Sequence, residues 1–500
     1  MVMDINSALV EIEAMEKKLA AIKHAAGILY YDGVTAAPRG SAAGRADTFA
    51  YLSEEDYKTF ACERTGELLK FLSDNLTGLV FPISKKIELL KEKYDKLVNV
   101  PMDEYVEYDV LVNESQDVWR RCKEDNDYAY FGPYVDKIVD TLKRFAGYFD
   151  SKKDPYDVWL NEFERGGSVA MYDEYFAAVK SRLVPLIGEI AKCPPPDTSF
   201  LKGVFPVCKQ RELTEDLMKF LLIDPDRCAI GETEHPFTSG MNYYDCRITT
   251  HYYEDNLLSS LYSVIHECGH AIYEMNMERS YYGNILSAGL SYGIHESQSR
   301  FYENIIGRSR AFSNFILPVI QNHFVGFSEV TPEMFYRAVN KAEPSLIRIE
   351  ADELTYSMHI MIRYEIEKLL FKGDVSQKEL PALWNTLYKE YLGIDVPNDT
   401  AGVLQDTHWG SGLFGYFPSY SIGSAYSAQM LYHIKKEFDI NRLIETGNIE
   451  PVFVWLKERV YRHGASRDPA EIIQNCCNEN FSSQYYVDYL EEKFRDIYQI

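Results

Sequence analysis

The sequence lacks any uninterrupted run of the roughly 18 apolar residues that a membrane-spanning helix requires. It also lacks the apolar core of a secretory signal peptide, because residues 1–31 carry charged side chains throughout. Clusters of lysine or arginine are missing as well, and a net charge of −24 would repel the phosphates of nucleic acid. These absences predict a cytoplasmic protein that binds neither membranes nor nucleic acid.

The cysteines do not have the spacing of a disulfide framework. They number nine, an odd set without a C-x-x-C pair, so we expect reduced thiols. Hydrophobic residues make up 46% of the chain and aromatic residues 14%, which excludes a disordered chain and provides for a substantial core. A length of 500 residues fits about three domains, although large helical enzymes also form one continuous body.

Helical periodicity dominates the pattern of apolar residues. It predicts an amphipathic helix over residues 4–30, followed by a broken loop with Gly33, Pro38, Gly40 and Gly44. Further helices are predicted at 84–98, 102–126, 133–150 and 172–192. Later in the chain, Ser376 with Glu379 forms a capping box, and Thr331 followed by Pro332 indicates another helix start.

The clearest interruption of the helical pattern is CPPPDTSFLKGVFP, residues 193–206. Consecutive prolines cannot continue a helix, so a loop is expected here. It separates an amino-terminal helical lobe, residues 1–192, from a catalytic region, residues 207–500. We expect these parts to form one continuous globular body.

Residues 237–253, FTSGMNYYDCRITTHYY, depart from the helical pattern. Their aromatic and β-branched residues suit strands, with Ser239 and Gly240 as turn material. Two interpretations remain open. The edge of a small sheet can hold an extended peptide through backbone hydrogen bonds, or the segment can be an ordinary structural hairpin.

A metal-binding pattern follows within LLSSLYSVIHECGHAIYE, residues 257–274, where His266, Glu267 and His270 form H-E-x-x-H. Residues four apart on a helix share a face, so both imidazoles can reach one metal ion. Glu267 would lie beside the ion, where it can take a proton from a water molecule that the metal activates. The pattern therefore predicts a metal-dependent hydrolase.

The same pattern has less specific interpretations. In a chain with 11 histidines it can occur by chance, and two histidines on a buried helix can be hydrogen-bonded core residues. The apolar neighbours and the small Cys268 and Gly269 favour the metal site. Cys268 points away from the ion and no cysteine-protease signature surrounds it, so we interpret it as a packing residue.

The candidate for the third metal ligand lies in SYGIHESQSRFYEN, residues 291–304. Glu296 is far enough from His270 for a turn through Gly283 and Gly289 and a returning helix. Ser299 and Arg300 would share its face and support it. His295 competes for the role, but adjacent residues point about a quarter-turn apart, so only one of the two can reach the metal. The two-histidine, one-glutamate set of thermolysin-type sites favours Glu296.

The blocks HECGHAIYE and GIHESQSRFYENIIGRS resemble the carboxypeptidase Taq-like metallopeptidases, a family of zinc carboxypeptidases. Four further blocks agree with that family: HPFT at 235–238, DCRITT at 245–250, IRIEADELTY at 347–356, and GVLQDTHW with GYFPSYSIG between 402 and 423. The amino-terminal part matches more loosely, through YYDGVTAAPRG and Arg45, with Tyr31 where the family pattern has Trp.

The resemblance implies a mainly α fold, a large helical body enclosing a deep cleft, with a small β-sheet next to the zinc helix, as in gluzincin-type peptidases. It implies peptide substrates with a free carboxyl terminus, a homodimer, and zinc as the cofactor, although the same ligands also accept cobalt or manganese. For the oxyanion it points to His408 and to Tyr416 or Tyr420, which we expect in a glycine-rich loop over the site.

Recognition of a terminal carboxylate is best served by arginine, whose planar fork donates two charge-assisted hydrogen bonds. The place of Arg348 in the family motif makes it the first candidate, and Arg247 in DCRITT is the second. His235 in HPFT is a candidate for the lining of the same cleft. Alternatively, Arg348 and Asp352 are four residues apart and can pair on a helix surface.

Three functions fit the sequence. The leading hypothesis is a zinc metallocarboxypeptidase that removes carboxy-terminal residues with broad specificity. The second is an endo-acting oligopeptidase or dipeptidyl carboxypeptidase with the same zinc site. The third, a non-catalytic helical scaffold with a structural metal, is opposed by Glu267 and by a set of three rather than four ligands.

Overall fold

The structure is a computed structural model that describes residues 3–287 and 291–500. The amino-terminal helices are α1 (Ile5–Thr35), α2 (Ala42–Phe60), α3 (Glu63–Asp74), α4 (Ile83–Asn99), α5 (Met102–Asp125), α6 (Tyr128–Phe149), α7 (Pro155–Phe163) and α8 (Val169–Ile190). The middle of the chain forms α9 (Val207–Phe220), β1 (Cys228–Glu232), β2 (Thr238–Asn242), β3 (Asp245–Thr250), α10 (Leu257–Met275), α11 (Tyr292–Arg300), α12 (Arg310–His323) and α13 (Pro332–Val339). The remaining helices are α14 (Tyr356–Lys372), α15 (Leu380–Leu392), α16 (Pro418–Glu437), α17 (Ile440–Glu445), α18 (Glu450–Arg459), α19 (Pro469–Cys477) and α20 (Gln484–Tyr498). The prediction of a mainly α fold with a small sheet is confirmed.

Local sequence signals explain several helix starts. Thr331 accepts the backbone N–H of Met334 at 3.2 Å, and Pro332 is the first residue of α13. The Ser376 and Glu379 side chains form the predicted capping box before α15. Each cap satisfies backbone N–H groups that a helix start otherwise leaves without a partner.

The break predicted after the first helix is much shorter than expected. Gly33 lies inside α1 and Gly44 inside α2, so only the segment around Pro38 and Gly40 interrupts the helices. A Cβ atom on Gly33 would lie 2.8 Å from Nε of Arg45. This glycine therefore allows a close approach of two helices instead of ending one. Gly289, expected in the turn before the helix of Glu296, lies outside the described residues.

The sheet has the order β1-β3-β2 within the described residues, with β1 parallel and β2 antiparallel to β3. The strand-rich segment was expected at 237–253; β1 lies outside it and is too short for a clear alternating pattern. Cys246 and Ile248 of β3 are buried against α10. α1 covers the edge strand β2, where the sulfur of Met241 lies against Gly27.

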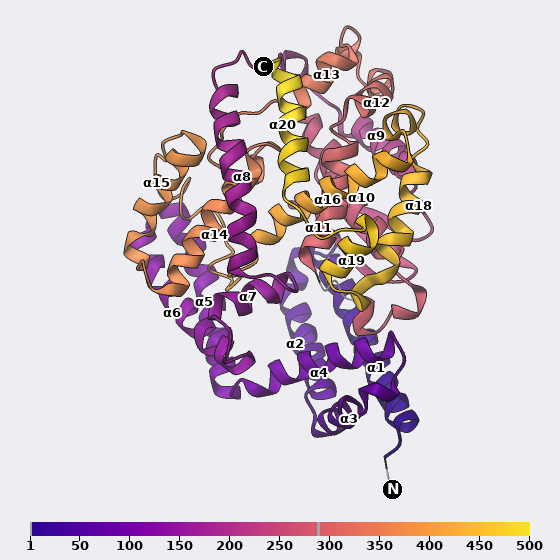
Figure 1. Cartoon of the computed structure of the whole chain (residues 1–500), viewed down its shortest axis with the longest axis vertical. Coiled ribbons are helices and arrows are strands. Elements are labelled where there is room, and N and C mark those ends of the chain that lie inside the picture. Colours follow the sequence, from indigo (N-terminus) through magenta and orange to yellow (C-terminus); the bar gives the residue numbers. More distant parts are fainter. Residues whose placement is uncertain (1–2, 288–290) are drawn as a thin grey trace.

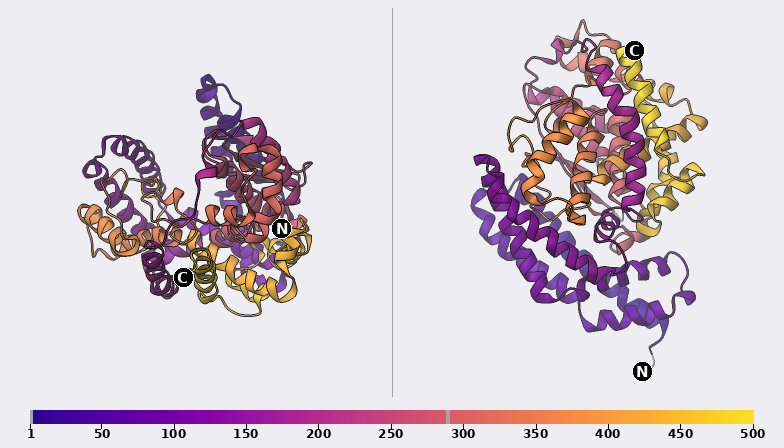
Figure 2. Two further views of the ribbon diagram at one scale, coloured as in Figure 1. Left: turned by 90° about the horizontal axis from the view of Figure 1, so that it is seen from above. Right: turned by 60° about the vertical axis from the view of Figure 1, so that its left-hand side comes forward.

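The molecule is elongated, with its two chain ends far apart along the long axis (Figure 1). The purple helices of the amino-terminal part lie below and along one side of the body, as Figure 2 also shows. α1, α3 and α4 share a small apolar cluster of their own, whereas α5 to α8 contribute to the large core around the catalytic region. α10, α11 and α16 lie inside that body and carry most of the site described below.

Residues 193–206 form the predicted loop between α8 and α9, with one 3-10 turn at Ser199–Leu201. α8, before this loop, packs beside α20 at the carboxyl end of the chain (Figure 1). The division into residues 1–192 and 207–500 remains our proposal for the domain organisation. Among the described helices, none is long and apolar enough to cross a membrane.

Candidate active site

The site is built on α10, which is buried along most of its length. Asn256 caps the helix by accepting the N–H of Ser259 at 3.2 Å. His266 and His270 lie one turn apart, and the centroids of their rings are 4.9 Å apart. The apolar residues that predicted this helix are therefore the ones that hold the two imidazoles in place.

Glu296 on α11 meets the two histidines. Its Oε2 lies 3.8 Å from Nε2 of His266 and 3.5 Å from Nε2 of His270. A tetrahedral zinc site with bonds of about 2.0–2.1 Å needs ligand atoms about 3.3–3.4 Å apart. The three ligand atoms all lie within 4.8 Å of one another. The two nitrogens and the carboxylate oxygen are therefore close enough together to hold one divalent metal ion.

The helix of Glu296 also supplies its support, as the spacing predicted. Arg300 Nε donates to Oε1 at 2.7 Å, and the hydroxyl of Ser299 donates to Oε2 at 3.1 Å. Burial alone would raise the pKa of Glu296, but Arg300 and the histidines lower it well below its usual value. The carboxylate is therefore ionised, which is the form that binds a metal.

Glu303 holds the first histidine and was not singled out from the sequence. Its Oε2 lies 2.9 Å from Nδ1 of His266, so Nδ1 carries the proton and the lone pair of Nε2 is left available for a metal ion. Burial would raise the pKa of Glu303, but Arg300, the bond from His266 and Arg308 lower it to about 2. Its position seven residues after Glu296, two helical turns along the same face, is the signal that could have identified it.

The segment of Glu303 is wound more widely than an α-helix. Phe301–Ile306 form a π-helical turn, η6, in which Gly307 N–H donates to the carbonyl of Tyr302 at 2.8 Å. Such turns are rare in proteins as a whole, but those that occur are often at functional sites. Here the turn directly follows the helix of Glu296.

His295 pairs with Glu274 and does not join His266, His270 and Glu296, which we call the metal cluster. Its Nε2 lies 2.7 Å from Oε1 of Glu274, and its ring packs against His270 at 4.5 Å between centroids. Burial and the neighbouring His295 lower the pKa of His270 to about 3, which keeps this imidazole neutral. Among the described residues, Nδ1 of His270 has no hydrogen-bond partner.

Glu267 lies between the two histidines and is nearly buried. The hydroxyl of Thr238, on β2, donates to its Oε2 at 2.6 Å and lies 3.0 Å from its backbone carbonyl. Burial raises the pKa of Glu267 above its usual value, against the effect of His266 and Thr238. A carboxylate with a raised pKa is a better proton acceptor near neutral pH.

His408, Tyr416 and Tyr420 lie together, as one group. The Tyr420 hydroxyl is 3.5 Å from Nε2 of His408, and the rings of Tyr416 and Tyr420 are 5.1 Å apart. Tyr420 is in the first turn of α16 and not in the preceding loop, because the helix begins at Pro418. Burial lowers the pKa of His408 to about 4, so its imidazole is neutral.

A buried carboxylate anchors the loop that carries His408. Glu367 on α14 accepts the Tyr156 hydroxyl at 2.9 Å, the Trp409 indole N–H at 2.8 Å and the Gly415 N–H at 2.8 Å. Burial raises the pKa of Glu367 to about 7 despite these donors. Sequence reasoning missed this residue, since nothing in its local pattern distinguishes it from an exposed helical glutamate.

Arg348 pairs with Asp406 and not with Asp352. Its Nε and Nη2 donate to one oxygen of Asp406 at 3.0 and 2.9 Å, and Nη1 donates to the Tyr356 hydroxyl at 3.2 Å. Asp352 instead accepts backbone N–H groups before α14, so the predicted pairing on a helix surface is wrong. The guanidinium of Arg348 also lies 5.2 Å from the Tyr420 ring, which places it with the His408 group.

The other two candidates for substrate binding are not part of these clusters. Arg247 forms two hydrogen bonds of 2.9 Å with Asp245 and stacks on Tyr31. Side chains alternate along β3, so Arg247 lies on the face opposite Cys246, which packs against α10. His235 is exposed in the connection between β1 and β2, where its carbonyl accepts the Thr233 hydroxyl.

Comparison with known proteins agrees with this geometry. A family model described as carboxypeptidase Taq (M32) metallopeptidase matches residues 11–494. The chain is 38% identical to Carboxypeptidase 1 of Bacillus subtilis, over 99% of this chain and 100% of that protein. It is 31% identical to Thermostable carboxypeptidase 1 of Pyrococcus furiosus, over 98% of this chain and 99% of that protein. The crystal structure of an M32 carboxypeptidase from Deinococcus radiodurans R1 superposes with a TM-score of 0.96 at 31% identity, covering 99% and 100% of the two chains.

Proposed function

Because the chain belongs to the carboxypeptidase Taq (M32) metallopeptidases and is a metallocarboxypeptidase, we propose that His266, His270 and Glu296 hold its metal ion. The observation that carries this assignment is the convergence of their three ligand atoms within 4.8 Å. Zinc is the metal we propose, with cobalt and manganese as alternatives that the same ligands accept.

The proposed proton carrier is Glu267. A bound metal ion supplies Lewis acidity, which makes a water molecule more acidic and polarises the scissile carbonyl. Oε1 of Glu267 accepts the proton of that water and passes it to the leaving amine nitrogen, while Thr238 holds Oε2. The orientation of the carboxylate is thus fixed before the substrate arrives.

The proposed oxyanion group consists of His408, Tyr416 and Tyr420. A neutral imidazole and two phenols present hydrogen-bond donors without carrying a charge of their own. Because Glu367 anchors the loop before α16, the donors are held in position and need not reorganise during the reaction.

Arg348 is our proposed contact for the terminal carboxylate. Three of its N–H groups are engaged by Asp406 and Tyr356, which leaves two of the five for a ligand. Arg363 donates to the second oxygen of Asp406 at 2.7 Å and so fixes this carboxylate from the other side. Arg247 and His235 remain weaker candidates for substrate contacts.

Three broader properties complete the proposal: broad preference for the carboxy-terminal residue, a homodimer, and activity in the cytoplasm. All nine cysteines, which lie within the described residues, are free thiols, as a reducing compartment favours. Sedimentation at several concentrations would test the homodimer, and a peptide set varied at its last residue would test the breadth of preference.

The deciding experiment measures metal content together with the products from a peptide ladder that has free or amidated carboxyl ends. We expect one ion per chain and stepwise loss of single residues from the free carboxyl ends only. Equal hydrolysis of the amidated peptides would reject the proposed carboxylate recognition and favour the endo-acting alternative.

A further inference from the structure

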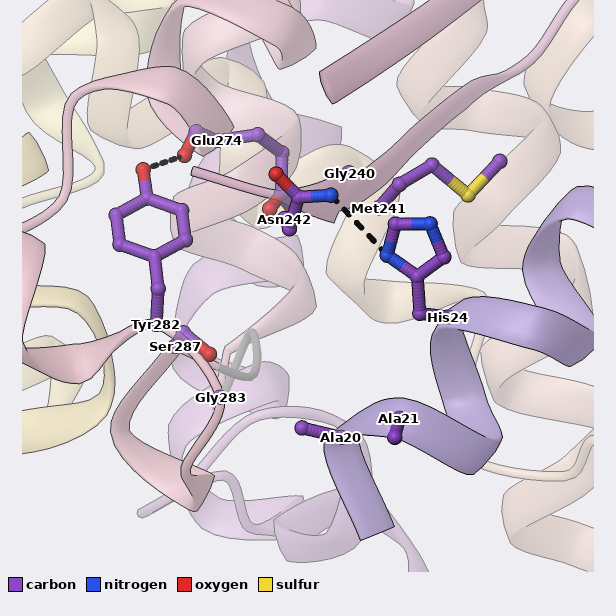
Figure 3. Close-up of a pocket in the computed structure, with 10 residues that line it drawn as sticks. All are labelled: Ala20, Ala21, His24, Gly240, Met241, Asn242, Glu274, Tyr282, Gly283 and Ser287. Carbon is purple, nitrogen blue, oxygen red and sulfur yellow. Dashed lines mark hydrogen bonds between the residues drawn. The ribbon is translucent and has the colours of Figure 1, made fainter. Parts of the chain in front are cut away.

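A cavity of about 480 Å³ lies beside the metal helix, between α1, β2 and the last turn of α10. Figure 3 shows residues from these elements and from the segment after α10 arranged around a common opening. Its polar lining consists of His24, Asn242, Glu274, Tyr282 and Ser287. None of these residues has a role in the mechanism proposed above.

Two elements, β2 and α10, connect the cavity lining with Glu267 and the candidate metal ligands. On β2, Thr238 contacts Glu267, and two residues later a Cβ on Gly240 would lie 2.6 Å from Oε2 of Glu274. Two residues of a strand span about 7 Å, the length of two residues of an extended peptide. On α10, Glu274 is one turn beyond His270 on the same face.

The cavity and the Arg348 group are connected to the metal ligands through different residues. Glu274 is reached from His270 through His295, which contacts both. Glu296 is connected to Arg348 through Arg300, whose guanidinium lies 4.6 Å from the ring of Tyr356, the residue that Arg348 contacts. If Arg348 holds the terminal carboxylate, the amino-terminal part of the peptide extends toward the cavity.

Glu274 is the acidic residue of the cavity lining. Its Oε1 is paired with His295, but none of the described residues donates a hydrogen bond to Oε2. Glu274 is also in the last turn of α10, where the helix dipole adds partial negative charge. A cation that enters this cavity therefore meets a carboxyl oxygen to which no described residue donates.

Several other polar groups of the lining already have partners among the described residues. Asn242 Nδ2 and His24 Nδ1 lie 3.1 Å apart, and Oδ1 of Asn242 accepts the Tyr244 N–H at 2.8 Å. The Tyr282 hydroxyl donates to the carbonyl of Glu274 (Figure 3). Oε2 of Glu274, in contrast, accepts no hydrogen bond from the described residues and is available to a ligand.

We propose that this cavity binds a positively charged group of the peptide substrate, two to four residues before the scissile bond. The group is the side chain of lysine or arginine, or the free α-amino group of a short peptide. This inference rests on the proposed function, because it assigns the cavity to the amino-terminal side of the peptide that the metal site hydrolyses. It makes Glu274 a specificity-determining residue.

The test measures peptide affinity by titration calorimetry on the metal-loaded Glu267→Gln variant, which binds peptides without rapid turnover. Amino-acetylated hexapeptides carry one lysine at the second, third, fourth or fifth position before the scissile bond, with glutamine or ε-acetyl-lysine as neutral references. A charge-assisted hydrogen bond at a partly exposed site predicts about 5- to 10-fold tighter binding of lysine at one of these positions. Equal affinity at every position would overturn the proposal.

Two further substitutions, made in the same background, separate charge recognition from damage to the metal site. Glu274→Gln removes the acceptor and should abolish the preference, whereas Glu278→Gln, at an exposed position four residues further along the chain, should keep it. Ala21→Lys adds a cation to the lining without touching α10 and should also abolish it, with Ala21→Gln as the matched control. A lysine preference that survives both Glu274→Gln and Ala21→Lys would refute the assignment.

Two further comparisons identify which positive group occupies the cavity and test the proposed function independently of the cavity. Tripeptides with a free or an acetylated amino end show whether the α-amino group also occupies the cavity; we expect the free form to bind more tightly. Hydrolysis of the glutamine peptide by the unmodified chain reports on the proposed function separately. Hydrolysis without charge-dependent binding would refute only the cavity assignment, and charge-dependent binding without hydrolysis would refute only the proposed function.

Discussion

From the contact between Glu303 and His266 we predict how much metal affinity falls when Glu303 is replaced. Glu303 fixes the proton on Nδ1 of His266 and so leaves Nε2 available for the metal. Partners of this kind typically change metal affinity 10- to 100-fold when they are lost. Because the Glu303 side chain is only 12% exposed, water cannot easily replace it, and the upper part of that range is expected.

Two substitutions distinguish the effects of the hydrogen bond and of the charge. Glu303→Gln keeps a carbonyl oxygen that can accept from Nδ1, so we expect about tenfold weaker metal binding. Glu303→Met removes the acceptor as well and should weaken binding about 100-fold, or about 3 kcal/mol. The affinities are measured by competition with a chelator of known affinity, at constant pH.

Glu333, which is partly exposed and pairs with Arg310 and Arg337, provides the matched control through Glu333→Gln. Circular dichroism must show that each variant is folded, because Glu303 also neutralises Arg300 and Arg308. Metal affinity of a folded Glu303→Met variant within twofold of the unmodified chain would refute the reasoning. Equal losses in the Gln and Met variants would show that the charge matters and the hydrogen bond does not.

Three further predictions concern the proton carrier, the oxyanion group and the anchored loop. Glu267→Gln should lower kcat by about 10²- to 10⁴-fold while elemental analysis still finds one ion per chain; a smaller loss would exclude the proton transfer. Tyr420→Phe and His408→Ala should each lower kcat about 10²- to 10³-fold with little change in KM on a free-carboxyl peptide, and a change in KM alone would instead indicate substrate binding. Burial raises the pKa of Glu367 from 4.5 to about 7. Between pH 4.5 and 7 the native state therefore keeps a proton on Glu367 that the unfolded chain has released. The associated stability, roughly 3 kcal/mol, is present in full below pH 4.5 and is lost as pH rises through 7. In urea unfolding from pH 4 to 8, the free energy of unfolding should therefore depend less on pH in Glu367→Gln than in the unmodified chain. The same pH dependence in both would contradict the raised pKa of Glu367.

The helices and the metal cluster were accessible to sequence reasoning because their signals are local. The spacing of His266 and His270 fixes a shared face on any helix, and capping residues such as Thr331 act within one turn. Helical geometry indicated that only one of His295 and Glu296 can reach the metal, since adjacent residues diverge, and the ligand set of thermolysin-type sites then favoured Glu296. The structure places these side chains accordingly, with His295 turned toward Glu274.

The contacts that sequence reasoning missed join residues far apart in the chain. Arg348 meets Asp406 and Glu367 meets Trp409, and no local period connects such positions. The glycine at Gly33 was misinterpreted for the same reason, because the helix that needs the space carries Arg45 beyond the break. Partners of this kind are determined by how elements pack, which propensity and spacing do not specify.

The π-helical turn makes the site sensitive to chain length as well as to side-chain identity. Deleting Phe301 or Tyr302 from η6 would favour α-helical winding and swing Glu303 about 100° around the axis relative to Glu296. The candidate metal ligands His266, His270 and Glu296 would all be retained, yet the imidazole of His266 would lose its hydrogen bond to the carboxylate of Glu303. In this segment an insertion or deletion is therefore more damaging than most exchanges of one amino acid for another.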